Sequence, residues 1–243
     1  MRNLVFFLLI VVAAKAGAAE TAEWLRHAER LTGESEAVRE RAIRRLKNVP
    51  GLEGQLTIAL TGPDRFLAVD VIATLKLKNL LPLLIDLSRI DDTGTTYLAM
   101  NALMDKDNAP LLTKLYKDRL LANPPPALAA RMVIIDTFGR IGFQLAAQEL
   151  NQLYSRGIYE VKSAVVAYAR LRLRAGVGIE AHSEFLKAAL KSPYQQLRLQ
   201  ALYAIKDLPS AQQSPWRERL ETCVGDRQEK VRELCLTVRN SLD

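Results

Sequence analysis

Aromatic residues are scarce in this sequence, and that scarcity limits the fold. Only 6% of the 243 residues are aromatic, although 49% are hydrophobic. Sandwiches and barrels are built from strands that are enriched in aromatic and β-branched residues, so they are disfavoured here. A composition rich in Ala and Leu suits closely packed helices. We therefore predict an all-α protein.

Catalytic and cofactor-binding motifs are also lacking. The chain has no Gly-x-Ser-x-Gly, no Walker loop and no dinucleotide fingerprint. Its two histidines, His27 and His182, have no carboxylate or cysteine at a metal-ligand spacing, so we expect them to have surface or capping roles. The two cysteines are not arranged as Cys-x-x-Cys. We expect no catalytic residue, no metal and no cofactor, and hence a protein that is not an enzyme.

The charge pattern does not indicate nucleic-acid binding. The 34 basic and 27 acidic residues give a formal charge of +7. Removing Arg2 and Lys15, which lie in a segment that we expect to be cleaved, leaves 32 basic residues against 27 acidic ones, or +5. The two signs alternate in runs such as residues 34–47 and 216–239, as on solvated helix faces. There is no dense basic stripe of the kind that DNA binding needs.

Residues 1–19 have the pattern of a signal peptide. Arg2 precedes an eleven-residue apolar run, Leu4 to Ala14, and small residues follow at 16–19. The alternative is a membrane anchor, but a spanning helix needs about 20 apolar residues. We predict cleavage after residue 18 or 19, a periplasmic or secreted location, and no stable membrane anchor after cleavage.

The rest of the chain repeats one pattern. It is clearest in Leu197 to Ile205 and recurs from Val38 to Val231 at steps of 28 to 36 residues, which is typical of a solenoid. In most copies the first, fifth and ninth residues are aliphatic or small, a spacing that places them on one helix face. The copies begin at Val38, Leu67, Thr95, Ala130, Val161, Leu197 and Val231.

The second position of the repeat is basic in five copies. These residues are Arg39, Arg131, Lys162, Arg198 and Arg232. The arrangement hydrophobic-Arg-x-x-Ala-x-x-x-Leu resembles the second helix of a HEAT repeat. The resemblance implies a superhelix of helix pairs whose second helices line the concave side, with the basic residues pairing to neighbours and ordering the stack. The alternative is that they form a ladder that binds a ligand. Two copies depart from the pattern: the one at Thr95 is weak, and the last has Arg239 at its ninth position, as a capping repeat would.

We predict fourteen helices in about seven pairs, forming one repeat domain over residues 20–243. Gly, Pro and Asp residues mark the expected turns. The expected helices cover residues 21–31, 34–47, 52–60, 64–76, 79–90, 95–104, 108–121, 127–140, 144–155, 159–174, 179–190, the helix at 197, 211–224 and 227–242.

Candidate binding residues follow from the repeat geometry. The seventh position lies one turn beyond the basic residue and holds Arg44, Asn101, Asp136 and Tyr203, whose side chains we expect to face the groove. Exposed surface explains them equally well. Cys223 and Cys235 lie on the last helix pair, where an even cysteine count in an exported chain allows a disulfide; two buried thiols are the alternative.

These observations favour an exported, non-enzymatic scaffold that binds a protein or peptide on its concave face. One alternative is an enzyme on a HEAT-like scaffold, similar to the bilin lyases or the alkylpurine DNA glycosylases. Both of those families work inside cells. Export and the missing basic groove weigh against a glycosylase, and no residue supports a lyase. A second alternative is a structural spacer without a selective groove. The sequence does not identify the partner.

Overall fold

The computed structural model describes residues 36–90, 93–213 and 216–241. These residues form helices and no strand, which confirms the all-α prediction for the described part of the chain. The signal-peptide prediction at residues 1–19, the predicted helix at 21–31 and His27 lie outside the described residues. The chain divides into two compact units, Met1–Leu112 and Thr113–Asp243.

The first unit contains α2 to α6, each short and each buried on one side. Their bounds are α2 (Glu36–Arg45), η2 (Leu46–Asn48), α3 (Leu52–Ala59), α4 (Arg65–Leu75), η3 (Lys78–Leu80), α5 (Leu81–Leu87) and α6 (Thr95–Leu103). Helix α4 packs against α2, α3 and α6, and α5 packs against α6. The core between them includes Leu56, Ile72, Leu84 and Met100, all fully buried.

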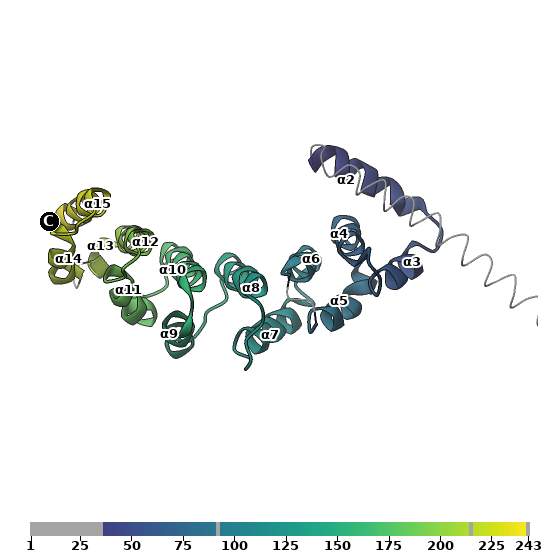
Figure 1. Cartoon of the computed structure of the whole chain (residues 1–243), viewed down its shortest axis with the longest axis horizontal. Coiled ribbons are helices and arrows are strands. Elements are labelled where there is room, and N and C mark those ends of the chain that lie inside the picture. Colours follow the sequence, from purple (N-terminus) through teal and green to yellow (C-terminus); the bar gives the residue numbers. More distant parts are fainter. Residues whose placement is uncertain (1–35, 91–92, 214–215, 242–243) are drawn as a thin grey trace, which may run out of the picture. The chain divides into compact units, whose positions relative to one another are not determined.

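The second unit contains helices α8 to α15, and the boundary between the units falls within α7 (Ala109–Leu120). Second helices of successive repeats pack against one another: α10 against α8 and α12, and α12 against α15 (Figure 1). The first helices α9 and α11 also pack together. The bounds are α8 (Leu128–Ile141), α9 (Ala147–Arg156), α10 (Tyr159–Arg174), η4 (Ile179–His182), α11 (Ser183–Leu190), α12 (Gln195–Lys206), α13 (Ser210–Gln213), α14 (Arg217–Val224) and α15 (Glu229–Asn240).

The repeat register agrees with burial in the second unit. The first, fifth and ninth positions of the copies at Ala130, Val161 and Leu197 are all buried. In α12, for example, Leu197, Ala201 and Ile205 have no exposed surface. In α4 the buried face is rotated by about one residue, because Ala68 and Ile72 are fully buried while Leu67 and Leu75 are only half-buried.

Helix α8 has glycine both on the side that meets α10 and at its C-terminal end. A Cβ at Gly139 of α8 would lie 2.9 Å from Leu171 Cδ1 of α10, so a larger residue there would displace the end of the Leu171 side chain. Gly142 ends α8 in the left-handed conformation, with φ at 78°, and the Phe143 N–H donates to the Phe138 carbonyl at 3.0 Å. This closure of the helix end is the one that glycine favours.

Several predicted helices are shorter or divided in the structure. The helix predicted at 79–90 is η3 followed by α5 and ends at Leu87, and the one predicted at 144–155 begins at Ala147. There the Glu149 carboxylate accepts a hydrogen bond from the Ala146 N–H at 2.8 Å, which starts the helix later. The helix predicted at 179–190 begins as η4, and the one predicted at 211–224 is observed as α13 and α14, with residues 214 and 215 outside the described part.

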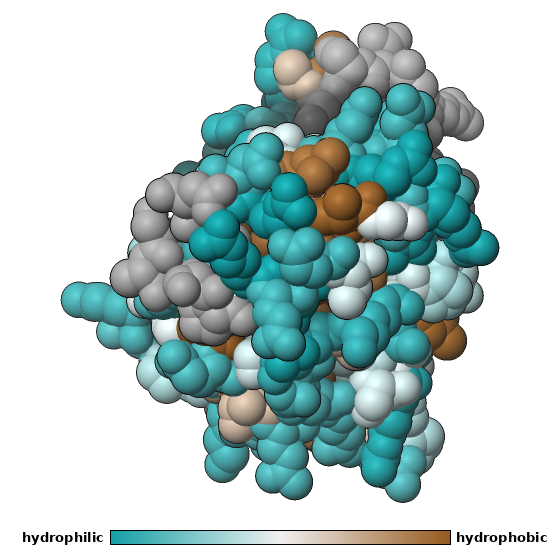
Figure 2. Space-filling view, turned by 90° about the vertical axis from the view of Figure 1, so that its left-hand side faces the viewer, coloured by the Kyte–Doolittle hydropathy of each residue, from teal (hydrophilic) through white to brown (hydrophobic). Residues whose placement is uncertain are grey.

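The last repeat presents polar side chains outward. Glu229, Lys230 and Glu233 of α15 are exposed, and Arg239 is half-buried and pairs with Glu221 at 3.3 Å. Figure 2 views the molecule from its C-terminal end, and hydrophilic residues cover most of the visible surface. The outward side of α15 is therefore polar.

Candidate functional site

The seventh-position residues lie on both units. In the first unit Arg44 is exposed on α2 and pairs with Glu40 at 3.2 Å, while Asn101 is half-buried on α6. In the second unit Asp136 is exposed on α8 and pairs with Arg140 at 2.7 Å, and Tyr203 of α12 is 41% exposed. Helix α10 packs between α8 and α12, so Asp136 and Tyr203 do not meet directly.

Tyr203 belongs to a polar cluster that joins α10 to α12. The Arg170 guanidinium carbon lies 5.0 Å from the Tyr203 ring centroid, within cation–π range. Arg170 Nε also donates to the Asp207 carboxylate, and Arg174 Nε donates to the same Oδ2 at 2.8 Å. We call these four residues, Tyr203, Arg170, Arg174 and Asp207, the α10–α12 cluster.

The α10–α12 cluster holds its acidic member charged. Partial burial alone would raise the pKa of Asp207, but hydrogen bonds and charge from Arg170 and Arg174 outweigh burial and lower it. Asp207 thereby fixes both guanidinium groups and, through Arg170, the Tyr203 ring. An aromatic ring beside fixed arginine side chains is typical of a protein-binding surface, because Tyr and Arg are enriched there.

Sequence reasoning missed Arg170, Arg174 and Asp207. The two arginines are four residues apart at the end of a helix, a spacing that places them on one face. That spacing was a visible signal, but the acidic partner lies in the next repeat, 33 and 37 residues away from them. Only the stacking of α10 on α12 brings it into reach.

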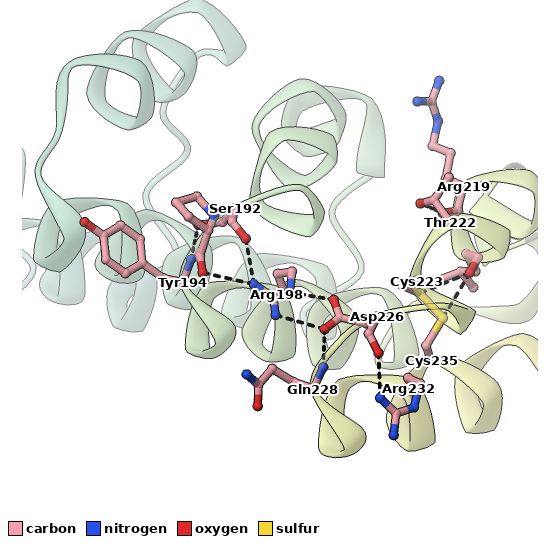
Figure 3. Close-up of polar contacts among 12 residues, drawn as sticks. Ser192, Tyr194, Arg198, Arg219, Thr222, Cys223, Asp226, Gln228, Arg232 and Cys235 are labelled. Carbon is pink, nitrogen blue, oxygen red and sulfur yellow. Dashed lines mark hydrogen bonds and ion pairs between the residues drawn. A yellow bond between two sulfur atoms is a disulfide. The ribbon is translucent and has the colours of Figure 1, made fainter.

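The basic second-position residues do not share one environment. Arg198 is 5% exposed; its Nη1 donates to the Ser192 carbonyl at 2.8 Å, and its Nη2 donates to Asp226 Oδ1 at 2.9 Å. Arg232 Nη1 donates to the Asp226 carbonyl at 2.7 Å, so the turn before α15 is held from two sides (Figure 3). These bonds join the last two repeats.

The other second-position residues lack this network. The Lys162 ammonium lies 5.4 Å from the centroid of the Tyr154 ring. Arg131 is half-buried, and its Nε has no hydrogen-bond partner within the described residues. Arg39 belongs to α2, but its side chain is outside the described part. The ladder is therefore not uniform along the chain.

The two cysteines and one histidine have well-defined environments. Cys223 of α14 and Cys235 of α15 form a disulfide, with their Cα atoms 6.0 Å apart, so the structure selects the bonded alternative (Figure 3). The surface or capping role expected for His182 is wrong: its side chain is fully buried, with Tyr168 and Phe185 rings edge-on to it at 6.1 and 5.9 Å. Neither ring nitrogen has a hydrogen-bond partner within the described residues.

No group of three His, Cys, Asp or Glu residues in the described ranges is placed to hold a metal ion. Among the same residues, none of the helices combines the length and apolar character that crossing a bilayer takes. Comparison with known proteins finds no matching family model and no matching curated protein.

Proposed function

We propose that this chain is an exported, non-enzymatic α-solenoid of HEAT-like repeats that holds a protein or peptide partner on the concave face formed by its second helices. The export signal and the repeat pattern in the sequence support the proposal. So does the packing of α8, α10, α12 and α15 in succession within the second unit. Repeats stacked in this way expose a side chain from each unit at one height.

The observation that carries the proposal is the α10–α12 cluster. Tyr203 is exposed although it is aromatic, and it is held in place by Arg170 rather than buried in the core. A rigid aromatic side chain can contribute large contact area at little cost in conformational entropy. Arginines that are already ordered by Asp207 lose less entropy when a partner binds.

The test is a comparison of two tyrosine variants in the second unit. Tyr194 is 52% exposed and its ring lies 5.0 Å from that of Tyr159, at the start of α12 rather than in the α10–α12 cluster. Tyr203→Ala and Tyr194→Ala therefore remove the same exposed ring from two places. We expect both to retain the wild-type melting temperature within about 3 °C, and only Tyr203→Ala to lose the partner captured from the native envelope fraction. Equal capture by both variants contradicts the proposal.

A further inference from the structure

The second unit contains a hollow between the turn joining α7 to α8 and the turn joining α9 to α10. Its volume is about 250 Å³. Apolar side chains form much of its wall, and two arginines, Arg131 of α8 and Arg156 at the end of α9, also line it. The apolar lining residues are Leu120, Leu121, Pro125, Leu153 and Val161.

The two arginines occupy repeat positions that hold an ion pair elsewhere. Arg198 stands second in its copy and pairs with Asp226, which precedes the anchor Val231 by five residues. Arg131 also stands second in its copy, and the residue that precedes the next anchor, Val161, by five is Arg156. Helix α8 packs against α10 as α12 packs against α15. The position five residues before the anchor is therefore an aspartate, Asp226, in the last repeat and a second arginine, Arg156, beside Arg131.

This replacement leaves positive charge without a partner. Neither Arg131 nor Arg156 forms an ion pair with any described residue, and Arg131 Nε, which is shielded from solvent, lacks a hydrogen bond within that part of the chain. Two guanidinium groups on one small hollow repel each other, and a partly buried donor without an acceptor is unfavourable. A bound anion would occupy the place that the Asp226 carboxylate takes beside Arg198.

The shape and lining restrict which anion fits. The hollow is smaller than the roughly 300 Å³ at which drug-sized pockets begin, so it holds one side chain and a small charged group. Arginine forks match the planar geometry of a carboxylate. The leucines, valine and proline that line the hollow favour a ligand whose carboxylate is attached to an aliphatic group. A peptide C-terminus ending in an aliphatic residue satisfies both conditions within one residue, and the exposed Asn123 side chain on the rim offers a hydrogen-bonding amide to the preceding peptide bond.

We propose that this hollow captures the C-terminal carboxylate and the last aliphatic side chain of a protein or peptide partner, with Arg131 and Arg156 as the carboxylate ligands. The inference rests on the proposed function, because it specifies the chemistry of a protein partner. It adds a second contact point that lies on the turns between helices rather than in the α10–α12 cluster.

The experiment measures fluorescence polarisation of a labelled peptide, Gly-Ser-Gly-Ala-Leu, in its free-acid and C-terminally amidated forms, with the full mature chain. We expect the free acid to bind at least about tenfold more tightly than the amide. The reason is that the amide has no carboxylate for the two arginines to bind. Arg131→Gln and Arg156→Gln should each weaken binding of the free acid about tenfold or more. Lys114→Gln, which removes an exposed cation from α7, is the matched control and should change nothing.

Arg156→Asp distinguishes a binding role from a packing role. It restores the Arg–Asp combination seen at Arg198 and Asp226, so it should raise the melting temperature by a few degrees while abolishing peptide binding. A variant that merely damaged the fold would lower both. Peptide binding that survives in Arg156→Asp overturns the inference.

Other outcomes are equally decisive. Equal affinity for the free acid and the amide, or no binding of the free acid at about 1 mM, overturns the inference. Displacement of the peptide by inorganic phosphate as effectively as by unlabelled peptide indicates a simple anion site. Stronger displacement by octanoate indicates a fatty-acid site, and either result replaces the peptide assignment. If the peptide fails to bind but Tyr203→Ala still loses the captured partner, only this inference fails and the proposed function stands.

Discussion

Arg198 and Asp226 form a buried ion pair that joins α12 to the turn before α15. Their charged groups are 2.7 Å apart, and only 7% and 11% of the two side chains is exposed. Asp226 Oδ1 also accepts a hydrogen bond from the Gln228 N–H at 2.9 Å. Burial raises the pKa of Asp226, but the Arg198 and Gln228 contacts outweigh it and lower the pKa below its usual value.

The first prediction concerns this pair. Asp226→Ala leaves the Arg198 guanidinium buried with only carbonyl partners, so the free energy of unfolding should fall by about 3 kcal/mol in urea denaturation. Asp136→Ala removes a partner of the exposed Arg140 and should cost no more than about 0.5 kcal/mol. Equal losses in the two variants would show that the Arg198 network is not structural.

The second prediction tests the repeat register. Ala201 is fully buried on α12, so Ala201→Asp places a charge without a partner between packed helices and should cost several kcal/mol, roughly 3 or more. Arg44 is exposed and has only an i,i+4 pair, so Arg44→Ala should change stability by about 0.5 kcal/mol or less. Differential scanning calorimetry measures the melting temperature of both variants. Similar shifts in the two melting temperatures would show that the assigned repeat register is wrong.

Burial was the part of the structure that the sequence predicted best. Helix α10 was predicted at 159–174 and spans Tyr159–Arg174, and the buried positions of α8, α10 and α12 match the repeat pattern. The reason is that a helix buried on one side imposes a period on its own sequence, which is readable without its neighbours. The same periodic pattern showed that the last copy has a charged residue, Arg239, at a position that is apolar in most other copies.

The polar sites were not predictable from the sequence. Arg170 and Asp207 meet only because α10 and α12 stack with a particular axial offset, and Arg131 and Arg156 line one hollow only because two turns lie side by side. The spacing between repeat copies varies from 28 to 36 residues, and this variation exceeds the length of one helical turn. The sequence therefore does not determine the axial offset between two stacked helices. The burial of His182 was missed because a lone histidine carries no periodic signal, and its environment is made by Tyr168 and Phe185.

The third prediction concerns the disulfide. Cys223 and Cys235 are 12 residues apart, and cross-linking a loop of this length stabilises a protein by about 3 kcal/mol in the chain-entropy estimate. The double variant Cys223→Ser/Cys235→Ser should lose roughly this amount in urea denaturation. Dithiothreitol should leave the free energy of unfolding of this variant unchanged. The same reductant should lower the free energy of unfolding of the wild-type protein. A wild-type protein that reductant leaves unchanged would contradict the prediction.

The fourth prediction is a pH dependence caused by His182. Burial, and then the charge of Arg172, lower the pKa of His182 from 6.5 to about 4. The unfolded chain therefore binds a proton between pH 6.5 and 4 that the folded chain does not bind, so stability is lost as the pH falls through this window. From pH 7 to pH 5 the loss should be about 2 kcal/mol.

His182→Phe supplies the control for that prediction. The substituted ring is apolar and cannot be protonated, and the site is already bounded by two aromatic rings. Unfolding free energies measured at pH 7 and pH 5 should differ much less in this variant than in the wild-type protein. The carboxylates whose pKa is lowered, such as Asp105 and Asp207, titrate below this interval and affect both proteins alike.

Site-specific photocrosslinking from position 203 determines whether the second helices hold a protein partner. A photoreactive phenylalanine analogue is placed at position 203, or at position 194 as the control, and the chain is expressed in its native host and irradiated. Both side chains are exposed aromatic rings in the same unit, so the replacements are matched in size and setting. We expect a discrete crosslinked protein from position 203 and none from position 194. The same products from both positions, or none from position 203, would contradict it.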